Sequence, residues 1–366
     1  MLRKKLRKML RKKRKRENPL IDMWSRKELL KVYLRGDPLC MNIEINERCA
    51  GGCRFCYASS KNQSQLKKDN LSWEMFQNLL RLKTLGAKVI YFYGGDQLLH
   101  PKFKDMLFHA IQQGFHIVCP LSALISESQA RWLTEAQQLA NSSNLEFFIG
   151  IHIDTLDQNI YNQINSIPGS LQKKIDGYNR LLEAGFPPDH VYGCPTLTNK
   201  NASTMITLMD WFYEKGAKHV AIVQYRPLGM GRENAAEWEP SLTQIEEVFF
   251  YRAKIEGKHM LAVGSSDGKY ACKCHVGVTA QGDVVPCLLL RDLPEGNIYK
   301  EDFLDIVKRG KKNLLFHIKV KGPCRWCKYK LYCFGCRANA YLYTGDIHAS
   351  DPKCFFNSKA PERCLK

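Results

Sequence analysis

The sequence lacks the features that would place the protein in a membrane or outside the cell. No run of apolar residues approaches the roughly 18 that a membrane-spanning helix needs. The N-terminus is densely charged, and no apolar segment of the kind found in secretory signal peptides follows it. We therefore expect a cytoplasmic protein in a reducing compartment, where clustered cysteines are typical of metal ligands rather than of disulfides.

Acidic residues are scarce, and the imbalance is concentrated at one end. The 366 residues include 36 Asp and Glu against 55 Lys and Arg, a formal net charge of +19, and residues 1–17 hold eleven of the basic residues. Four apolar residues recur at helical spacing within that segment (Leu2, Leu6, Met9 and Leu10). The segment is either a solvated arm or a short amphipathic helix that contacts an anionic membrane surface or an acidic partner.

Sequence fingerprints for binding nucleotides and nucleic acids are also missing. The glycines of "PLGMG" (Pro227–Gly231) have no third glycine after them and no helix start, which excludes a dinucleotide fingerprint. The body of the chain contains no helix-turn-helix, stacking platform or zinc-finger spacing. A zinc-containing nucleic-acid adaptor with a basic tail is therefore a distant alternative.

Apolar runs and amphipathic segments alternate from residue 38 onward. Strands are predicted at 40–45, 87–93, 115–121, 145–153, 190–196 and 218–225. Helices are predicted at 72–85, 103–114, 171–184, 205–215 and 242–255, and a further one follows the third strand and ends at about residue 138. Six β/α units with right-handed crossovers predict an α/β fold, a partial (β/α)6 TIM-like barrel over residues 38–257. The alternation then stops, so we expect a small cysteine-rich domain at residues 258–366 and a tail and lead-in at residues 1–37.

Cysteine is abundant, and its distribution is uneven. Of 15 cysteines, three lie in "ERCAGGCRFCYA" (Glu47–Ala58), after the first predicted strand, and nine lie beyond residue 270. Barrels carry their chemistry at this end of the strands. Three thiolates can anchor three irons of a [4Fe–4S] cluster and leave the fourth iron open, and Gly51 and Gly52 let the loop fold closely around it. A zinc knuckle with a distant fourth ligand is the alternative, but structural zinc usually shows symmetric cysteine pairs.

This segment resembles the signature of the radical S-adenosylmethionine (SAM) enzymes, with Phe55 before the last cysteine and Tyr57 after it. The resemblance implies that Cys49, Cys53 and Cys56 are the catalytic centre and the ligands of a [4Fe–4S] cluster whose open iron binds SAM. Reduction of that cluster by a flavodoxin- or ferredoxin-type donor would cleave SAM to a 5′-deoxyadenosyl radical, which abstracts hydrogen from a substrate.

Other segments resemble the strand ends that bind SAM in this family. "YFYGGDQLLHP" (Tyr91–Pro101) resembles the segment that meets the methionine amino group, with Asp in the usual Glu position. "IGIHIDTLDQNIYNQINSIPGS" (Ile149–Ser170) resembles the segment beside the ribose, with His where many members carry Ser, and "CPTLTNKN" (Cys194–Asn201) resembles the fifth strand end. The resemblance implies that SAM is bound by Phe55, Tyr57, Gly94, Gly95, Asp96, His152, Asp154 and Asn201. Barrel packing or loop capping is the alternative role for each of the last three polar residues.

The C-terminal cysteines form a second array. The spacing of Cys324, Cys327, Cys333 and Cys336 also suits a zinc ribbon. In context, however, the array resembles the SPASM extension of radical SAM enzymes, which binds two auxiliary [4Fe–4S] clusters. The resemblance implies two sets of metal ligands: Cys324, Cys327, Cys333 and Cys354 for an outer cluster, and Cys287, Cys336, Cys272 and Cys274 for an inner one. The last two are unusually close together, so whether both bind iron stays open.

Two further expectations concern the remaining residues. Gly282 is predicted to form a tight turn between two short strands that present Cys287. The other cysteines (Cys40, Cys119, Cys194 and Cys364) are expected to be plain core or surface thiols.

The resemblance implies a radical SAM oxidoreductase or maturase. Its substrate would be a peptide or protein in a maturation pathway, since most SPASM members modify peptides. The alternative is a small precursor in tetrapyrrole, haem or quinone cofactor biosynthesis. The stretch before the first predicted strand is short and mostly basic. A peptide substrate would therefore need a separate recognition protein, or none.

Overall fold

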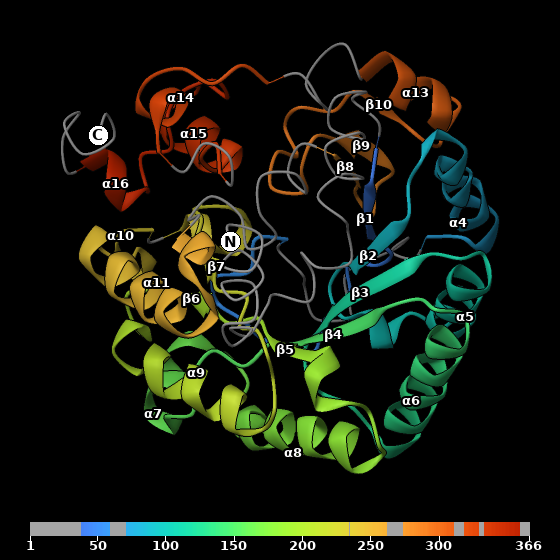
Figure 1. Cartoon of the computed structure of the whole chain (residues 1–366), viewed down its shortest axis with the longest axis horizontal. Helices are drawn as coiled ribbons and strands as arrows, with labels where there is room; N and C mark the ends of the chain where they lie inside the picture. Colours follow the sequence, from blue (N-terminus) through green and yellow to red (C-terminus); the bar gives the residue numbers. More distant parts are fainter. Residues whose placement is uncertain are drawn as a thin grey trace, which may run out of the picture.

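The helices and strands follow the alternation in the sequence. A computed structural model describes residues 38–58, 71–233, 235–261, 274–310, 318–328 and 333–358. The basic N-terminal segment, Cys272 and Cys364 lie outside the described residues. Figure 1 shows a curved sheet whose outer face is covered by helices, with residues 274–310 at one end of the sheet and residues 323–328 and 333–358 across the opening from them.

The predicted barrel elements are confirmed with small shifts at their ends. The first five strands are β1 (Cys40–Glu44), β2 (Val89–Tyr93), β3 (His116–Leu121), β4 (Phe147–Ile151) and β5 (Val191–Gly193). The helices that follow them are α4 (Trp73–Leu80) with η1 (Arg81–Leu85), α5 (Phe103–Gln112), α6 (Glu127–Ser142), α8 (Ser170–Glu183), α9 (Met205–Glu214) and α11 (Leu242–Glu256). None of the described helices is long and apolar enough to span a membrane.

Local signals in the sequence explain several helix starts. Ser72 caps α4, because its hydroxyl accepts from the amide of Met75 at 3.1 Å. Capping boxes begin α6 and α11, each formed by a serine and a glutamine three residues later. These side chains satisfy amides that have no partner within the helix.

The sixth predicted strand is shorter than the sequence suggests. The prediction covers 218–225, but the structure has only β7 (Val223–Gln224), which pairs with β6 (Thr196–Leu197) in a separate two-stranded sheet. A single bridge between Gly193 and Val220 continues the barrel. Pro195 interrupts the strand between β5 and β6, because proline has no amide to donate to a neighbouring strand.

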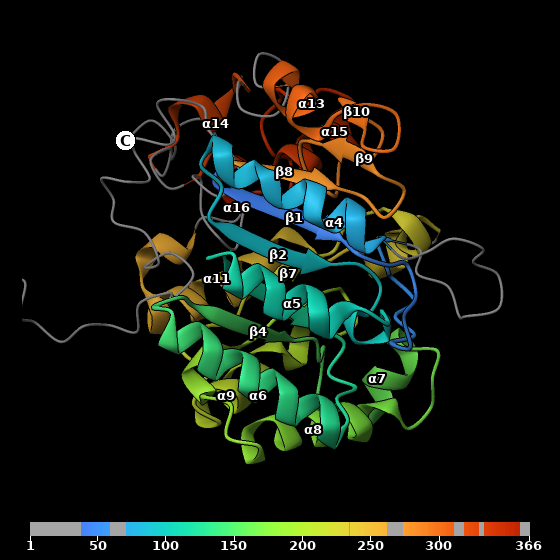
Figure 2. The same cartoon turned by 90° about the vertical axis from the view of Figure 1, so that its right-hand side faces the viewer.

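Two features were not predicted from the sequence. Helix α7 (Gln158–Ile164) precedes α8, with Asp157 as its N-cap. Strand β8 (His275–Val278) pairs in parallel with β1, so the C-terminal segment extends the barrel's own sheet (Figure 2). The sheet order is β10-β9-β8-β1-β2-β3-β4-β5.

The C-terminal elements are short. Strands β9 (Asp283–Val285) and β10 (Gly296–Asn297) are antiparallel to their neighbours. The turn predicted at Gly282 is present, with a φ of 86°. The helices beyond it are α13 (Phe303–Gly310), α14 (Pro323–Trp326), α15 (Arg337–Thr344) and α16 (Phe355–Ser358).

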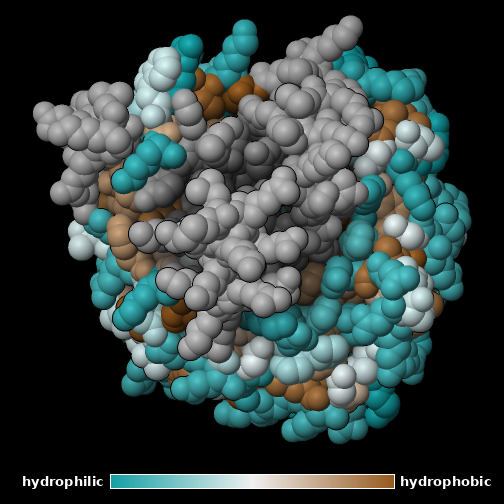
Figure 3. Space-filling view, in the orientation of Figure 1, coloured by the Kyte–Doolittle hydropathy of each residue, from teal (hydrophilic) through white to brown (hydrophobic). Residues whose placement is uncertain are grey.

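Side chains alternate between two buried faces along the strands. Met41 and Ile43 of β1 pack under the helices, whereas Cys40, Asn42 and Glu44 occupy the alternate positions facing the barrel interior. Burial on both faces is expected of parallel strands that are covered by helices. The solvent-facing side of α5, α6 and α8 is mostly hydrophilic (Figure 3). Cys40, Cys119 and Cys194 are buried in these hydrophobic clusters, as expected of plain core thiols.

Candidate functional site

A cavity of about 360 Å³ lies inside the barrel, between the strand ends and the C-terminal segment. Both cysteine arrays reach its wall. Its lining includes Cys49, Cys53 and Cys56 of the first array and Cys287 and Cys336 of the second. The cavity therefore joins the two parts of the chain in which the sequence predicts metal ligands.

The three-cysteine loop directly follows β1, and three neighbouring segments fix its backbone. The first is the end of β2. The amide of Gly95 donates to the carbonyl of Asn46 at 3.0 Å, and that of Asp96 donates to the carbonyl of Arg48 at 2.6 Å. A Cβ atom at residue 95 would lie 2.0 Å from the Arg48 oxygen. Glycine is therefore required here by the close approach of two backbones.

The second segment is the connection between α7 and α8. The amide of Arg54 donates to the Ile164 carbonyl at 3.0 Å, and the amide of Ser166 donates to the Gly52 carbonyl at 2.8 Å. The side-chain amide of Asn165 donates to the Gly51 carbonyl. These contacts hold the middle of the loop against the start of α8.

The third segment is the "PLGMG" stretch after β7. The amide of Met230 donates to the Cys56 carbonyl at 2.9 Å. Gly229 has a φ of 55°, and a Cβ atom there would lie 2.4 Å from the Tyr57 carbonyl oxygen. This glycine pair, which is no dinucleotide fingerprint, lets the stretch after β7 pack directly on the loop.

Tyr57 is also anchored to the C-terminal segment. Its hydroxyl donates to the buried carboxylate of Glu44 at 3.3 Å. The same carboxylate accepts from the Arg291 guanidinium and from the Ala280 amide. One buried group on β1 thus ties the end of the loop to residues after β8.

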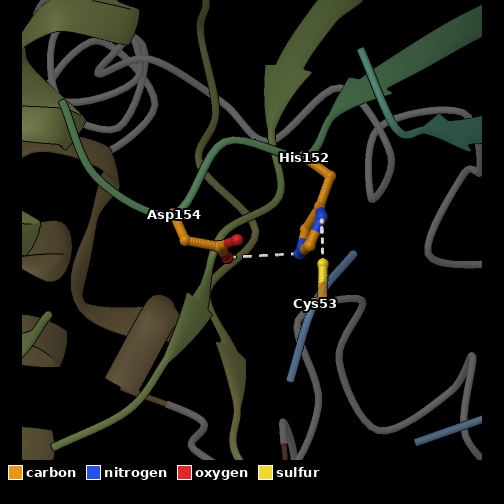
Figure 4. Close-up of side chains that lie close together, drawn as sticks. All are labelled: Cys53, His152 and Asp154. Carbon is orange, nitrogen blue, oxygen red and sulfur yellow. Dashed lines mark hydrogen bonds and ion pairs between the residues drawn. The ribbon is translucent and has the colours of Figure 1, made fainter. Parts of the chain in front are cut away.

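The charges around Cys53 form a short chain. Figure 4 shows the imidazole of His152 between Cys53 and Asp154. Its Nδ1 lies 3.9 Å from the Cys53 sulfur and its Nε2 lies 3.2 Å from an Asp154 oxygen. Burial disfavours the imidazolium, but the charges of Asp154 and Cys53 outweigh it and raise the pKa of His152 to about 10.

The three thiols cannot all ionise together at neutral pH without a cation. Burial, with the charges of Asp96 and Cys53, raises the pKa of Cys49 to about 12. For Cys53 burial acts in the same direction, but His152 and Lys174 outweigh it and lower the pKa. Since soft metal ions bind thiolates and supply positive charge, the donor set fits an iron–sulfur cluster.

Five of the eight residues predicted to bind SAM line the cavity: Phe55, Tyr57, Gly94, Gly95 and His152. The other three lie behind its wall and shape the strand ends. Asp96 accepts from the Leu98 amide and the Ser122 hydroxyl. Asp154 accepts from the Thr196 amide at 2.8 Å, and Asn201 donates to the Asp154 carbonyl at 2.8 Å.

The sequence did not single out several polar residues in the cavity wall. Asn42, Gln97 and Gln224 are buried there, and each has one amide atom without a hydrogen-bond partner among the described residues: Asn42 Oδ1, Gln97 Oε1 and Gln224 Nε2. Buried polar atoms are costly when unpaired, so these atoms point to a ligand. The usable signals were the position of Gln97 next to the "GGD" segment and that of Gln224 at the start of "QYRPLGMGR" (Gln224–Arg232), which resembles the sixth strand end of the family.

The auxiliary cysteines are held by N–H donors. Arg226 donates to the Cys336 sulfur at 3.3 Å and to Asn339 Oδ1 at 2.9 Å, so it links β7 to α15. Asn357 donates to the Cys324 sulfur at 3.3 Å, and the amide of Gly335 donates to the Cys333 sulfur at 3.3 Å. Such donors suit thiolates that ligate iron.

The structure describes more of the contacts of the predicted outer set of cysteines than of the inner set. Burial, with the charges of Asp351, Cys333 and Cys324, raises the pKa of the Cys354 thiol, so these three cysteines are neighbours. Cys327 is the C-cap residue of α14, three residues after Cys324. Cys274 is buried at the start of β8 and packs in the interior cluster with Cys40.

Fold and site together define an enzyme class. The Radical SAM superfamily model matches residues 43–212, and the SPASM model, an iron–sulfur cluster-binding domain, matches residues 271–337. The chain is a radical SAM enzyme with a C-terminal SPASM domain. Its cofactors are SAM and a SAM-binding [4Fe–4S] cluster, with auxiliary iron–sulfur clusters in the SPASM domain, as the sequence predicted.

The chain is similar over most of its length to named enzymes. It is 22% identical to the AdoMet-dependent heme synthase of Methanosarcina barkeri, over 89% of this chain and 98% of that protein. It is 24% identical to the PqqA peptide cyclase of Streptomyces rochei, over 90% of this chain and 92% of that protein. The fold matches Streptococcus suis SuiB bound to precursor peptide SuiA, with a TM-score of 0.62, 15% identity and coverage of 90% and 79%.

Proposed function

We propose that the protein modifies a peptide or protein by SAM-dependent radical chemistry. The observation that carries this proposal is a cavity that residues of both cysteine arrays line together. A substrate group in that cavity would lie between the SAM-binding cysteines and the auxiliary ones. One related enzyme is named for a peptide substrate, and a protein of the same fold has been solved with a precursor peptide.

We propose the following ligands. Cys49, Cys53 and Cys56 hold the cluster that, with SAM bound, supplies the 5′-deoxyadenosyl radical. Cys324, Cys327, Cys333 and Cys354 hold the outer auxiliary cluster, and Cys287 and Cys336, with Cys272, Cys274 or both, hold the inner one. Phe55, Tyr57, Gly94, Gly95 and His152 contact SAM, while Asp96, Asp154 and Asn201 fix the backbone around it.

The size of the cavity favours a peptide over a tetrapyrrole. About 360 Å³ is at the lower end of the range for a pocket that holds one small molecule. A cavity of that size that also holds SAM has little enclosed room left, so a peptide that enters with one side chain suits it better than a whole macrocycle. The unpaired amide atoms of Asn42 and Gln224 would then hydrogen-bond to the polar groups of that peptide.

The protein's own residues prepare the site for this chemistry. The hydrogen bonds that Gly95, Asn165 and Met230 donate to backbone carbonyls of the loop and its lead-in hold the three thiols at the cavity wall. Tyr91, Tyr93 and Tyr192 form part of its wall and keep bulk water away from a reactive species. No general base is required of these residues, because the substrate loses a hydrogen atom rather than a proton.

Two partners belong to this proposal. A flavodoxin- or ferredoxin-type protein supplies the electron, and a separate peptide-recognition protein can present the substrate. The cytoplasm is the compartment we propose, because free thiols and iron–sulfur clusters need reducing surroundings.

Anaerobic purification followed by iron and sulfide analysis tests the cofactors. We expect about twelve irons per chain, four for each of three clusters. Stoichiometric zinc without absorbance near 400 nm would contradict the proposal. The purified enzyme is then incubated with SAM, dithionite and the peptides encoded beside its gene. A mass change that requires Cys49, Cys53 and Cys56 supports peptide modification, whereas turnover of a tetrapyrrole precursor alone refutes it.

A further inference from the structure

Lys174 is a fully buried cation in the first turns of α8. None of its surface is exposed. Its ammonium donates to the carbonyl oxygen of His152 at 3.1 Å and lies 5.8 Å from the centre of the Tyr161 ring. Among the described residues, no carboxylate oxygen lies within 4.0 Å of its nitrogen. The cation is therefore enclosed without an ion pair in this part of the chain.

Such an arrangement is costly unless a negative charge compensates it. Moving an ammonium out of water costs several kcal/mol, and one carbonyl and one aromatic face do not neutralise it. Burial disfavours the charged form of Lys174, yet nearby negative charge, that of Cys53 first and then those of Tyr161, Asp154 and Cys49, holds its pKa above the ordinary range. The thiols of the three-cysteine loop are thus among the groups that this cation faces.

The backbone explains why Lys174 faces that loop. The residues just before α8 pair with it, through Ser166 and Asn165 to the carbonyls of Gly52 and Gly51. Helix α8 then begins at Ser170, and helical side chains tilt back toward the N-terminus of their helix. The same helix end carries a positive partial charge, which adds to that of Lys174.

We propose that Lys174 is a fixed counter-cation, beside His152, of the cluster held by Cys49, Cys53 and Cys56, and that its charge raises the reduction potential of that cluster. This inference rests on the proposed function of the three cysteines. With three thiolates and the positive charge of its own irons, the cluster carries a net charge of about −1 when oxidised and about −2 when reduced. A permanent positive charge nearby stabilises the reduced cluster more than the oxidised one. Lys174 acts through the Cys53 side of the loop and is a positioning residue, because it does not line the cavity.

The test replaces Lys174 and compares it with its neighbour on the same helix. Lys174→Met removes the charge at nearly constant length, and Lys173→Met removes a charge from an exposed position. The midpoint potential of each loaded enzyme is measured by redox titration with electron paramagnetic resonance. The signal that is missing from the C49A/C53A/C56A enzyme identifies the SAM-binding cluster among the three.

We expect K174M to lower the equilibrium constant for reducing that cluster at least tenfold, or 59 mV for a one-electron couple. K173M should keep the parent potential. A parent-like potential in K174M overturns the inference, and so does a weakened affinity for SAM at unchanged potential, which would make Lys174 a SAM ligand. If the parent lacks the signal that the triple variant removes, the proposed function fails first.

A second comparison covers the case in which K174M cannot hold the cluster. The cluster-free forms of the parent, K174M and K174Q are then unfolded by heat. If the variants without cluster are as stable as the parent, Lys174 is needed for the charge of the cluster, as proposed. If they unfold at a lower temperature, Lys174 supports the fold of the protein itself, and the inference is overturned.

Discussion

Replacing Gly95 by alanine tests whether the close approach of two backbones holds the three-cysteine loop in place. The added Cβ would lie 2.0 Å from the carbonyl oxygen of Arg48, whereas carbon and oxygen atoms in close contact are about 3.3 Å apart. Either the loop or the end of β2 must therefore move by more than about 1 Å. Gly95 has no positive φ, so alanine is compatible with its backbone and the contact alone causes the effect.

The expected loss follows from that displacement. Misplacing a reacting group by about 1 Å costs on the order of a hundredfold in rate. Overpacking of this kind also costs about 1–3 kcal/mol of stability. We therefore expect G95A to form 5′-deoxyadenosine about a hundredfold more slowly than the parent, or to lose the iron of one cluster. Both are measured on anaerobic enzyme, by chromatography of the SAM products and by iron analysis.

Gly185→Ala is the matched control. Gly185 ends α8 with a φ of 89°, and the nearest atom to its Cβ would be 4.0 Å away on Thr134. Alanine there meets backbone strain of about 1–2 kcal/mol but no collision. We expect G185A to keep the parent's iron and rate, with a lower unfolding temperature. Parent-like iron and rate in G95A itself would show that the contact does not position the loop.

Three more predictions test other parts of the structure. Arg226→Met should uncouple the reaction, because it removes the guanidinium donor to Cys336 and Asn339, which keep their other contacts, while leaving the three-cysteine loop intact. We expect substrate modification to fall and SAM cleavage to persist, and equal losses of both would contradict this. Gln224→Leu removes the Nε2 donor, which has no partner among the described residues, and also the Oε1 acceptor of the Asn339 amide, which keeps Asp351 as its other acceptor. We expect the KM for substrate to rise about tenfold, the value of one hydrogen bond of about 1.4 kcal/mol, with an unchanged Kd for SAM. Glu256 is buried and accepts from the Tyr213 hydroxyl at 2.6 Å and the Val220 amide at 2.9 Å, and although burial disfavours its charge, His219 and Arg252 hold its pKa below the ordinary value. The contribution of ionised Glu256 to the free energy of unfolding is therefore fully present above about pH 4.3 and is lost as the pH falls through the lowered pKa. In urea unfolding of the cluster-free protein, the free energy of unfolding should fall more steeply with acid in the parent than in Glu256→Gln.

The features that the sequence predicted correctly are those that depend on a local pattern of residues. Strand alternation located β1 to β5, and the spacing of Cys49, Cys53 and Cys56 led to the right enzyme class. In both cases the signal lies within a few neighbouring residues. Family resemblance then supplied the cofactors, which composition alone could not.

The polar wall of the cavity could not be predicted, because its residues come together only in the folded chain. Asn42 and Gln224 are ordinary residues in short apolar runs, and their unpaired atoms depend on distant segments. Lys174 stands beside Lys173 in an amphipathic helix and has the sequence signature of a solvated residue. Its burial follows from the pairing of residues 164–166 with the three-cysteine loop, more than a hundred residues earlier.

The pairing of β8 with β1 has a consequence for how the chain can be divided. Residues Cys40–Ile43 use one edge of β1 to bond to β8 and the other to bond to β2. A fragment that ends before β8 would expose a hydrophobic strand edge, which readily pairs with other chains. The first cysteine array cannot therefore be isolated simply by shortening the protein. Such a fragment would be prone to aggregate, and its inactivity would say nothing about whether the auxiliary cysteines take part in the chemistry.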